Sequence, residues 1–314
     1  AVVGLAAGGG PWNDLPAVDE SMLTGRSALG PRPRRRWKHL DAALPAAGRL
    51  PQTGAYLEEL AVPGGHWAIP PKEIPQILPQ HLLMPSVAAA ALADAGQPLK
   101  ADRPRASVVV GMGFDFEATD FHLRWRLTEI LERLNRRQGS ALDPAALETW
   151  ASQLWEGLPP PLTPEGTLGA LGSVIASRLA REFRFGGPSF TVAAESLSGL
   201  QALEIGARAL ERGECDLIVA GAVDLAGDPR QLLIDAHRGA LSQEGSEGGP
   251  SVPGLPPGEG ACAVILKRLE DARADGDRIY AVLRGRGWAL DSVTPEAAPA
   301  EAWERCRAGA DDSP

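Results

Sequence analysis

The chain has 314 residues, of which 44% are hydrophobic, so it is long enough for about two domain-sized units with a large buried core. Its net charge of −9 argues against a nucleic-acid binder, because neutralising phosphates requires a basic surface. The cysteines Cys215, Cys262 and Cys306 are too widely spaced for a zinc or disulfide framework, and we expect a reducing cytoplasm. The apolar run 87–93 is too short to span a membrane, so no membrane association is expected.

The first third of the chain predicts two buried strands and one helix. Residues 1–10 form an apolar run closed by glycines, which favour a turn, and residues 31–80 are rich in Pro and Gly and predicted to be irregular. A helix is predicted over 86–96, with Ser86 as its N-cap and a glycine as its stop. Residues 106–113 then form a second buried strand.

Residues 120–137 have the clearest helical pattern in the sequence. Apolar side chains recur at i, i+3, i+4 and i+7 along this segment. The pairs Glu129–Arg133 and Glu132–Arg136 have the i,i+4 spacing that brings opposite charges together on a helix. The pattern therefore predicts a helix over the whole segment.

The rest of the chain continues to alternate between helices and strands. Residues 167–183 predict one mostly buried helix, and residues 199–212 predict another whose apolar face begins at Leu200. Continuous apolar strands that alternate with helices indicate an α/β fold with parallel pairing and helices on both faces of the sheet. The strands predicted in this part are 189–194, 216–224, 261–269 and 279–287.

Three motifs that could carry chemistry have simpler explanations. The glycines of "AVVGLAAGGGPW" lack the G-x-G-x-x-G spacing of a dinucleotide site and suit a strand and turn better. Asp115, Glu117 and Asp120 match no metal-binding loop, and we expect no metal. The basic segment 32–39 is either a solvated loop or a docking patch for an acidic carrier protein. The docking residues would be Arg34, Arg35, Arg36 and Lys38.

Residues 187–206, "GPSFTVAAESLSGLQALEIG", predict a strand, a tight turn and a helix, a shape that often presents a nucleophile. The turn holds Ser196, but a serine hydroxyl gains little from a helix start and needs a base within hydrogen-bond reach. The G-x-S-x-G elbow is absent, because Ala194 and Ser198 stand at its glycine positions. The residues alone are compatible with three interpretations: a catalytic turn that has lost its catalyst, a serine enzyme, or a structural bend. A serine enzyme would take its base from His39, His66, His81, His122 or His237.

An ordered set of motifs over residues 1 to about 287 resembles the β-ketoacyl synthase family of the thiolase-like superfamily. The motifs are "IPPKEIPQILPQHLLMPSVAAAALADAG", "SVIASRLAREFRFGGPSFTV", "CDLIVAGAVD" with "ALSQEG", and "PPGEGACAVILKRLEDARADGDRIYAVLRGRG". The resemblance implies a layered αβαβα fold. It also implies a family N-terminal domain over 1–270, with residues 271–314 starting a truncated C-terminal half.

The same resemblance bears on the turn at Ser196. Active members carry their nucleophilic cysteine in a "D-T-A-C-S-S" turn, and alignment from "GPSFTV" puts that cysteine on Ser196. The family's catalytic histidines and lysine belong to the part of the C-terminal half beyond "AWERCRAGADDSP". A turn without the cysteine is typical of chain-length factors, and "GMGFDFEATDFHLRWRL" is similar to the chain-length-factor-type domains of bacterial polyunsaturated fatty-acid and polyketide synthases.

This resemblance implies a non-elongating protein that pairs with an active ketosynthase and an acyl carrier protein. A homo- or heterodimer through "SFTVAA" is expected, with no cofactor other than the phosphopantetheine arm of the carrier. The rival activities are decarboxylation of a malonyl carrier protein and acyl transfer through Ser196. Bulky side chains after the second strand would close the acyl tunnel, although they could equally fill the core. These side chains are Met112, Phe114 and Phe116.

Overall fold

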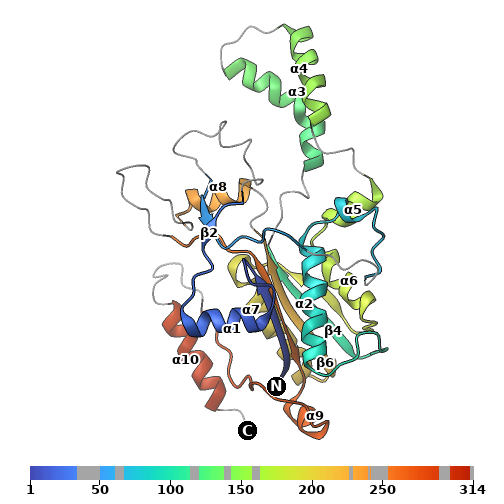
Figure 1. Ribbon diagram of the computed structural model, residues 1–314, viewed down its shortest axis with the longest axis vertical. Coiled ribbons are helices and arrows are strands. Elements are labelled where there is room, and N and C mark those ends of the chain that lie inside the picture. Colours follow the sequence, from blue (N-terminus) through green and yellow to red (C-terminus); the bar gives the residue numbers. More distant parts are fainter. Residues whose placement is uncertain are drawn as a thin grey trace.

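A five-stranded sheet forms the centre of the structure (Figure 1), with the strand order β1-β7-β6-β4-β5. The strands are β1 (Val2–Gly9), β4 (Ala106–Met112), β5 (Ser189–Val192), β6 (Leu217–Asp224) and β7 (Gly260–Leu266). Two short strands, β2 (Gly30–Pro31) and β3 (Thr53–Gly54), pair separately. The computed structural model describes residues 1–33, 50–60, 67–113, 120–137, 143–157, 163–225, 229–239, 241, 254–289 and 298–311.

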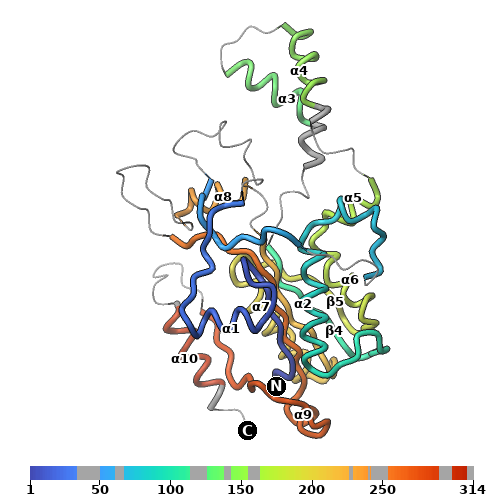
Figure 2. Tube along the Cα trace, viewed as in Figure 1, coloured from blue at the N-terminus to red at the C-terminus, as the bar shows by residue number. Residues whose placement is uncertain are grey.

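The sheet is mixed, so the expectation of uniformly parallel pairing is wrong. β4 is parallel to β5 and to β6, but β7 is antiparallel to both of its neighbours, β6 and β1. Figure 2 shows the result, with the chain's first strand lying beside its last. An apolar run indicates that a strand is buried but not which way it points, since both directions bury the same side chains.

The strand predicted at 279–287 is not formed. In this segment a single bridge joins the chain to the start of β1, where Val2 exchanges backbone hydrogen bonds of 2.8 and 2.9 Å with Ala281 and Tyr280. Beyond the bridge, residues 282–289 run without regular structure toward α10 (Ala298–Asp311). The segment is apolar enough for a strand, but within the described residues its pairing with the edge strand β1 does not extend beyond this bridge.

Helices cover both faces of the sheet. On one face lie α2 (Gln80–Asp94) and α6 (Val174–Glu182), and on the other lies α7 (Ser198–Glu211). Because side chains alternate along a strand, Val108 and Val110 of β4 pack toward α2 and α6, whereas Val109 packs toward α7. This places two buried apolar layers against one sheet.

Two predicted helices differ from the structure. α2 begins at Gln80 and continues through Pro85, so Ser86 is inside the helix and its hydroxyl donates to the Leu82 carbonyl (3.4 Å) instead of capping. The single helix predicted over 167–183 is two helices, α5 (Pro164–Ala170) and α6, with a break between them at residues 171–173.

The clear helical pattern at 120–137 is confirmed as α3 (Asp120–Arg137), including both ion pairs, Arg133–Glu129 at 2.9 Å and Arg136–Glu132 at 3.8 Å. It packs against α4 (Pro144–Gly157), which was not predicted, and the hairpin stands away from the sheet at the top of Figure 1. None of the described helices is long and apolar enough to cross a lipid bilayer. The other helices are α1 (Leu15–Thr24), η2 (Ile74–Gln76), η4 (Glu195–Leu197), α8 (Pro229–His237) and α9 (Leu269–Ala274).

Candidate functional site

The turn between β5 and α7 has the strand–turn–helix shape that the sequence predicts. Its last residues form the short helix η4, and α7 begins immediately afterwards at Ser198. The backbone N–H of Ala194 donates to Ser198 Oγ (2.9 Å), and that hydroxyl donates to the carbonyl of Glu195 (2.6 Å). Ser198 is buried, so this internal pair of hydrogen bonds holds the turn closed.

The backbone of the turn is strained next to Ser196. Glu195 has φ of 50°, a left-handed conformation that costs a non-glycine residue about 1–3 kcal/mol. Such strain persists only where the surroundings enforce it. The strain is therefore located one residue before Ser196, the position where the resemblance puts the family's nucleophile.

A close backbone contact fixes the start of α7 against the sheet. A Cβ added to Gly111 of β4 would lie 2.4 Å from the carbonyl carbon and oxygen of Ser198, so only glycine fits there. Gly199 has a similar restriction, because its added Cβ would lie 2.9 Å from Ala222 Cβ on β6. The two parallel central strands thus position the turn at their carboxyl ends, the usual edge for a site in α/β folds.

Ser196 is exposed at this edge, and within the described part of the chain its hydroxyl has no hydrogen-bond partner. The neighbouring carboxylate of Glu195 is 85% exposed and lies 3.8 Å from Arg238 Nη1, which follows α8. The ion pair therefore brings the end of α8 to the turn. A carboxylate beside Ser196 disfavours an anionic nucleophile and also repels an anionic substrate, because like charges disfavour one another at short range.

The histidines proposed as a base for Ser196 differ in their positions. His81 of α2 is fully buried on the opposite face of the sheet from α7, so it cannot serve. His237 is exposed at the end of α8, one residue before the arginine that pairs with Glu195. Of His39, His66 and His122, the first two lie outside the described residues, and the side chain of the third is not described.

Burial also sets the charge of His81. Burial, and after it the positive charge of Arg178 on α6, lower the pKa of the imidazole to about 4, with the backbone of Leu171 offsetting part of the effect. The ring is therefore neutral at pH 7. Its role is in the packing of α2 against α6 and not in chemistry at the turn.

The residues expected at the tunnel and the docking patch are mostly outside the described part. Met112 is described and is 3% exposed, packed with the core on the α2 and α6 side beside Gly172. Phe114 and Phe116 lie outside the described residues, as do Arg34, Arg35, Arg36 and Lys38. Their assigned roles remain predictions.

Leu200 does not lie on the buried face of α7, contrary to the prediction. It is 57% exposed, whereas Ala202, Ala207 and Leu210 are buried against the sheet. The helix is thus oriented so that Leu200, in its first turn, points away from the core. Sequence periodicity identified the helix but placed one member of its stripe on the wrong side.

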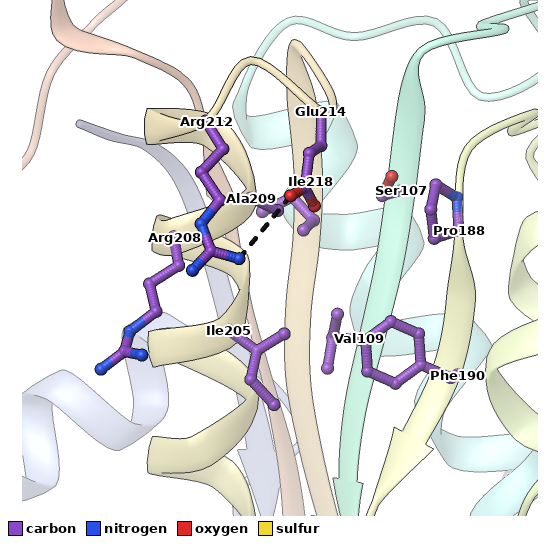
Figure 3. Close-up of a pocket in the computed structure, with 10 residues that line it drawn as sticks. All are labelled: Ser107, Val109, Pro188, Phe190, Ile205, Arg208, Ala209, Arg212, Glu214 and Ile218. Carbon is purple, nitrogen blue, oxygen red and sulfur yellow. Dashed lines mark ion pairs between the residues drawn. The ribbon is translucent and has the colours of Figure 1, made fainter.

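A cavity of about 270 Å³ lies between α7 and the edge strand β5 (Figure 3). Its wall is apolar, from Val109 and Ile218 of the central strands, Ile205 of α7 and Phe190 of β5. Charged side chains of α7 and the loop after it form the rim, where Arg212 Nη1 lies 3.8 Å from a Glu214 carboxylate oxygen. Phe190 is 40% exposed, so the open edge of the sheet is apolar on this side.

Sequence reasoning missed several residues that shape the turn: Gly111, Glu195, Ser198 and Arg238. A glutamate within an otherwise small-residue turn was visible as a signal. Its arginine partner was not, because the two are 43 residues apart and only the position of α8 brings them together. Within the described residues, no group of three or more His, Cys, Asp or Glu side chains is arranged to hold a metal ion.

Comparison with known proteins defines the class to which this fold and turn belong. The family model described as "Beta-ketoacyl synthase, N-terminal domain" matches residues 1–272. The chain belongs to the β-ketoacyl synthase family, and its mixed α/β structure is thiolase-like.

Relatives of the chain are much longer proteins. It is 28% identical to a polyunsaturated fatty acid synthase component of Thraustochytrium sp., covering 94% of this chain but 14% of that protein. It is 29% identical to polyketide synthase ThaG of Burkholderia thailandensis, covering 90% of this chain and 4% of that protein. The chain therefore corresponds to a small part of each of these synthases.

Solved ketosynthases share the fold. An oxazolomycin ketosynthase domain from Streptomyces albus superposes with a TM-score of 0.67 at 26% identity, covering 98% of this chain and 51% of that one. A structure described as "PfaC Keto synthase-Chain length factor" has a TM-score of 0.72 at 23% identity, covering 92% of this chain and 30% of that one. The chain thus spans about half or less of these two ketosynthase structures.

Proposed function

We propose that this chain is a chain-length-factor-like, non-elongating ketosynthase homologue that pairs with an active ketosynthase in fatty-acid or polyketide synthesis. The observation that carries the proposal is the turn itself. By alignment the family's nucleophile position falls on Ser196, and the exposed carboxylate of Glu195 precedes it on a strained backbone. A cysteine at a helix start readily forms a thiolate, whereas a serine there needs a base.

The same carboxylate weighs against decarboxylation, and the need for a base limits acyl transfer. Decarboxylation of a malonyl thioester requires a negatively charged malonyl group close to the turn, where Glu195 would repel it. Acyl transfer through Ser196 requires a base, and the described candidate near the turn is His237. Arg238 neutralises only part of the carboxylate's charge, because both members of the pair are largely exposed and solvent weakens their interaction.

The edge strand supports the pairing part of the proposal. Among the described strands β5 pairs with β4 alone, and its other edge offers backbone groups beside the exposed Phe190. A second ketosynthase-type chain adding its own strand there would extend the sheet and cover the cavity next to α7. A carrier protein would supply the acyl group on its phosphopantetheine arm, and this chain would bind no cofactor of its own.

Intact mass spectrometry with acetyl- and malonyl-loaded carrier protein tests the proposal. We expect no acyl adduct on the wild-type chain and no carbon dioxide above that of a reaction without the chain. An adduct that disappears in both Ser196→Ala and His237→Gln would instead establish a serine acyltransferase. Carbon dioxide release that persists in Ser196→Ala and increases in Glu195→Ala would establish a decarboxylase. As a control for access, Ser196→Cys should take up one more iodoacetamide-derived group than the wild type, in which Cys262 is exposed and Cys215 is buried.

A further inference from the structure

The α3–α4 hairpin presents a surface that the proposed function does not use. The two helices bury Leu127 and Leu131 between them, and the principal packing of α3 among the described elements is with α4. Figure 1 shows the pair projecting from the body of the protein. Both outer flanks of the hairpin are therefore open to other molecules.

The two flanks can be told apart by helical spacing. On one flank a polar groove is lined by Thr128, Glu132 and Asn135 of α3, at i, i+4 and i+7, together with Pro144 and Glu148 of α4. Residues on the other side of the buried stripe lie on the opposite flank. For α3 these are Arg126, Ile130, Arg133 and Arg137, again spaced by four, three and four residues.

On α4 the same opposite flank carries Trp150, with Ala146 one turn before it. Trp150 is 40% exposed, and Leu134 and Leu154 at the margin of the buried stripe are 41% and 38% exposed. We call the surface formed by Arg126, Ile130, Arg133, Arg137, Trp150 and Leu154 the Trp150 face. It combines an exposed aromatic ring and aliphatic side chains with a row of arginines.

The Trp150 face is basic in a chain that is acidic overall. Its three arginines are exposed, and Glu129 pairs with two of them, Arg126 and Arg133, at 2.9 Å each. On α3 one carboxylate stands against three guanidinium groups. With Asp143, whose side chain accepts from the Ala146 N–H at the start of α4, this flank still has one excess positive charge, whereas the whole chain has a net charge of −9. Arg137 lies beyond this pairing, at the end of α3 nearest to α4's first turn.

We propose that the Trp150 face binds an acidic amphipathic helix of a partner protein. Tryptophan and arginine are the side chains that most often dominate binding energy at interfaces, and the guanidinium fork matches a carboxylate. An amphipathic helix with Leu and Glu on neighbouring stripes complements both parts of the face. The proposal does not depend on whether Ser196 reacts, because no residue of the Trp150 face belongs to the turn.

Charge and shape favour a protein partner over a membrane surface. Electrostatic attachment to anionic lipid typically uses clusters of 4–8 basic residues together with an inserted apolar face. Here Glu129 interrupts a row of three arginines, and the aromatic contact is a single exposed ring among the described side chains of the face. A short acidic helix needs only these few contacts.

The test uses a fluorescein-labelled helical peptide with Glu on one stripe and Leu on the next, titrated with the full chain and followed by anisotropy. We expect saturable binding that weakens with added salt, and a loss of about tenfold or more in Trp150→Ala and in Arg137→Glu. The matched control is Arg136→Glu, the same change of charge one residue away on the other side of α3. It should reduce binding by less than about threefold, and circular dichroism should show all three variants equally helical.

Three results would overturn the proposal. The first is no saturable binding of the peptide. The second is an equal loss in Arg136→Glu and Arg137→Glu, which would show a non-specific effect of charge. The third is binding to phosphatidylserine vesicles, lost in Trp150→Ala, with no binding to the peptide, because that result would assign the face to a membrane.

Discussion

His81 makes the stability of this protein sensitive to mild acid. In the folded chain the pKa of its imidazole is about 4, because it is buried, whereas an exposed histidine titrates near 6.5. As the pH falls below 6.5, the unfolded chain takes up a proton at this position and the folded chain does not. Stability from this group is therefore fully present above pH 6.5 and is lost progressively down to pH 4.

The size of the loss follows from the two pKa values. A displacement from 6.5 to about 4 corresponds to about 3 kcal/mol in the free energy of unfolding. Urea denaturation of the wild type, of His81→Leu and of the exposed control His237→Gln, at pH 7.0, 5.5 and 4.5, measures it directly. We expect the difference between wild type and His81→Leu to change by most of this amount across the range, while the control follows the wild type.

Carboxylates that titrate in the same range contribute equally to all three proteins and cancel in the comparison. A buried, neutral His81 is contradicted if His81→Leu loses as much stability in acid as the wild type. It is also refuted if nuclear magnetic resonance places the His81 pKa near 6.5. Either result would mean that water or an acidic partner reaches the ring in the folded protein.

Three other changes test the turn, the tunnel and the basic segment. Gly111→Ala should lower the free energy of unfolding by about 1–3 kcal/mol, because the added Cβ pushes the start of α7 away from the sheet. Gly113→Ala is the control, since its added Cβ meets nothing within 4 Å, and its stability should change little. Equal melting temperatures of the two variants would contradict the contact. With the partner synthase present, Phe114→Ala and Phe116→Ala should lengthen the product. Each should destabilise the protein by less than the about 3–5 kcal/mol that truncating a core phenylalanine costs. Large destabilisation with unchanged product length would contradict the tunnel assignment. Reversing the charges of the four basic side chains within residues 34–38 should slow association with the carrier protein and weaken its dependence on salt, as measured by stopped flow. An unchanged association rate would support the interpretation of this segment as a solvated loop.

Local chemistry explains why several elements could be predicted without the structure. The helix at 120–137 has its apolar stripe and its ion pairs within single turns, so sequence neighbours alone are enough to predict it. The strand–turn–helix at Ser196 was also predictable, since an apolar run and a helical period meet at a small-residue turn. Its likeness to the ketosynthase turn came from the order of motifs over the chain.

Other features depend on contacts between distant segments. Pro85 lies within α2 because tertiary packing of the helix outweighs a missing backbone donor, so local rules placed the helix start six residues too late. The break between α5 and α6 falls where Gly172 approaches Met112 of β4, a contact that no local pattern contains. In both places, tertiary contacts determine where a helix begins or breaks.

By itself, the sequence determined that buried strands alternate with helices and that a tight turn leads into α7, and its resemblance to the family predicts that Ser196 stands where active members carry cysteine. These depend on side-chain periodicity and on residue identity, which are local. Only the tertiary structure decided that β7 runs antiparallel to its neighbours, that His81 is buried away from the turn, and that Arg238 reaches Glu195. Each of these depends on which segments lie side by side, and a chain specifies that through the packing of its whole core.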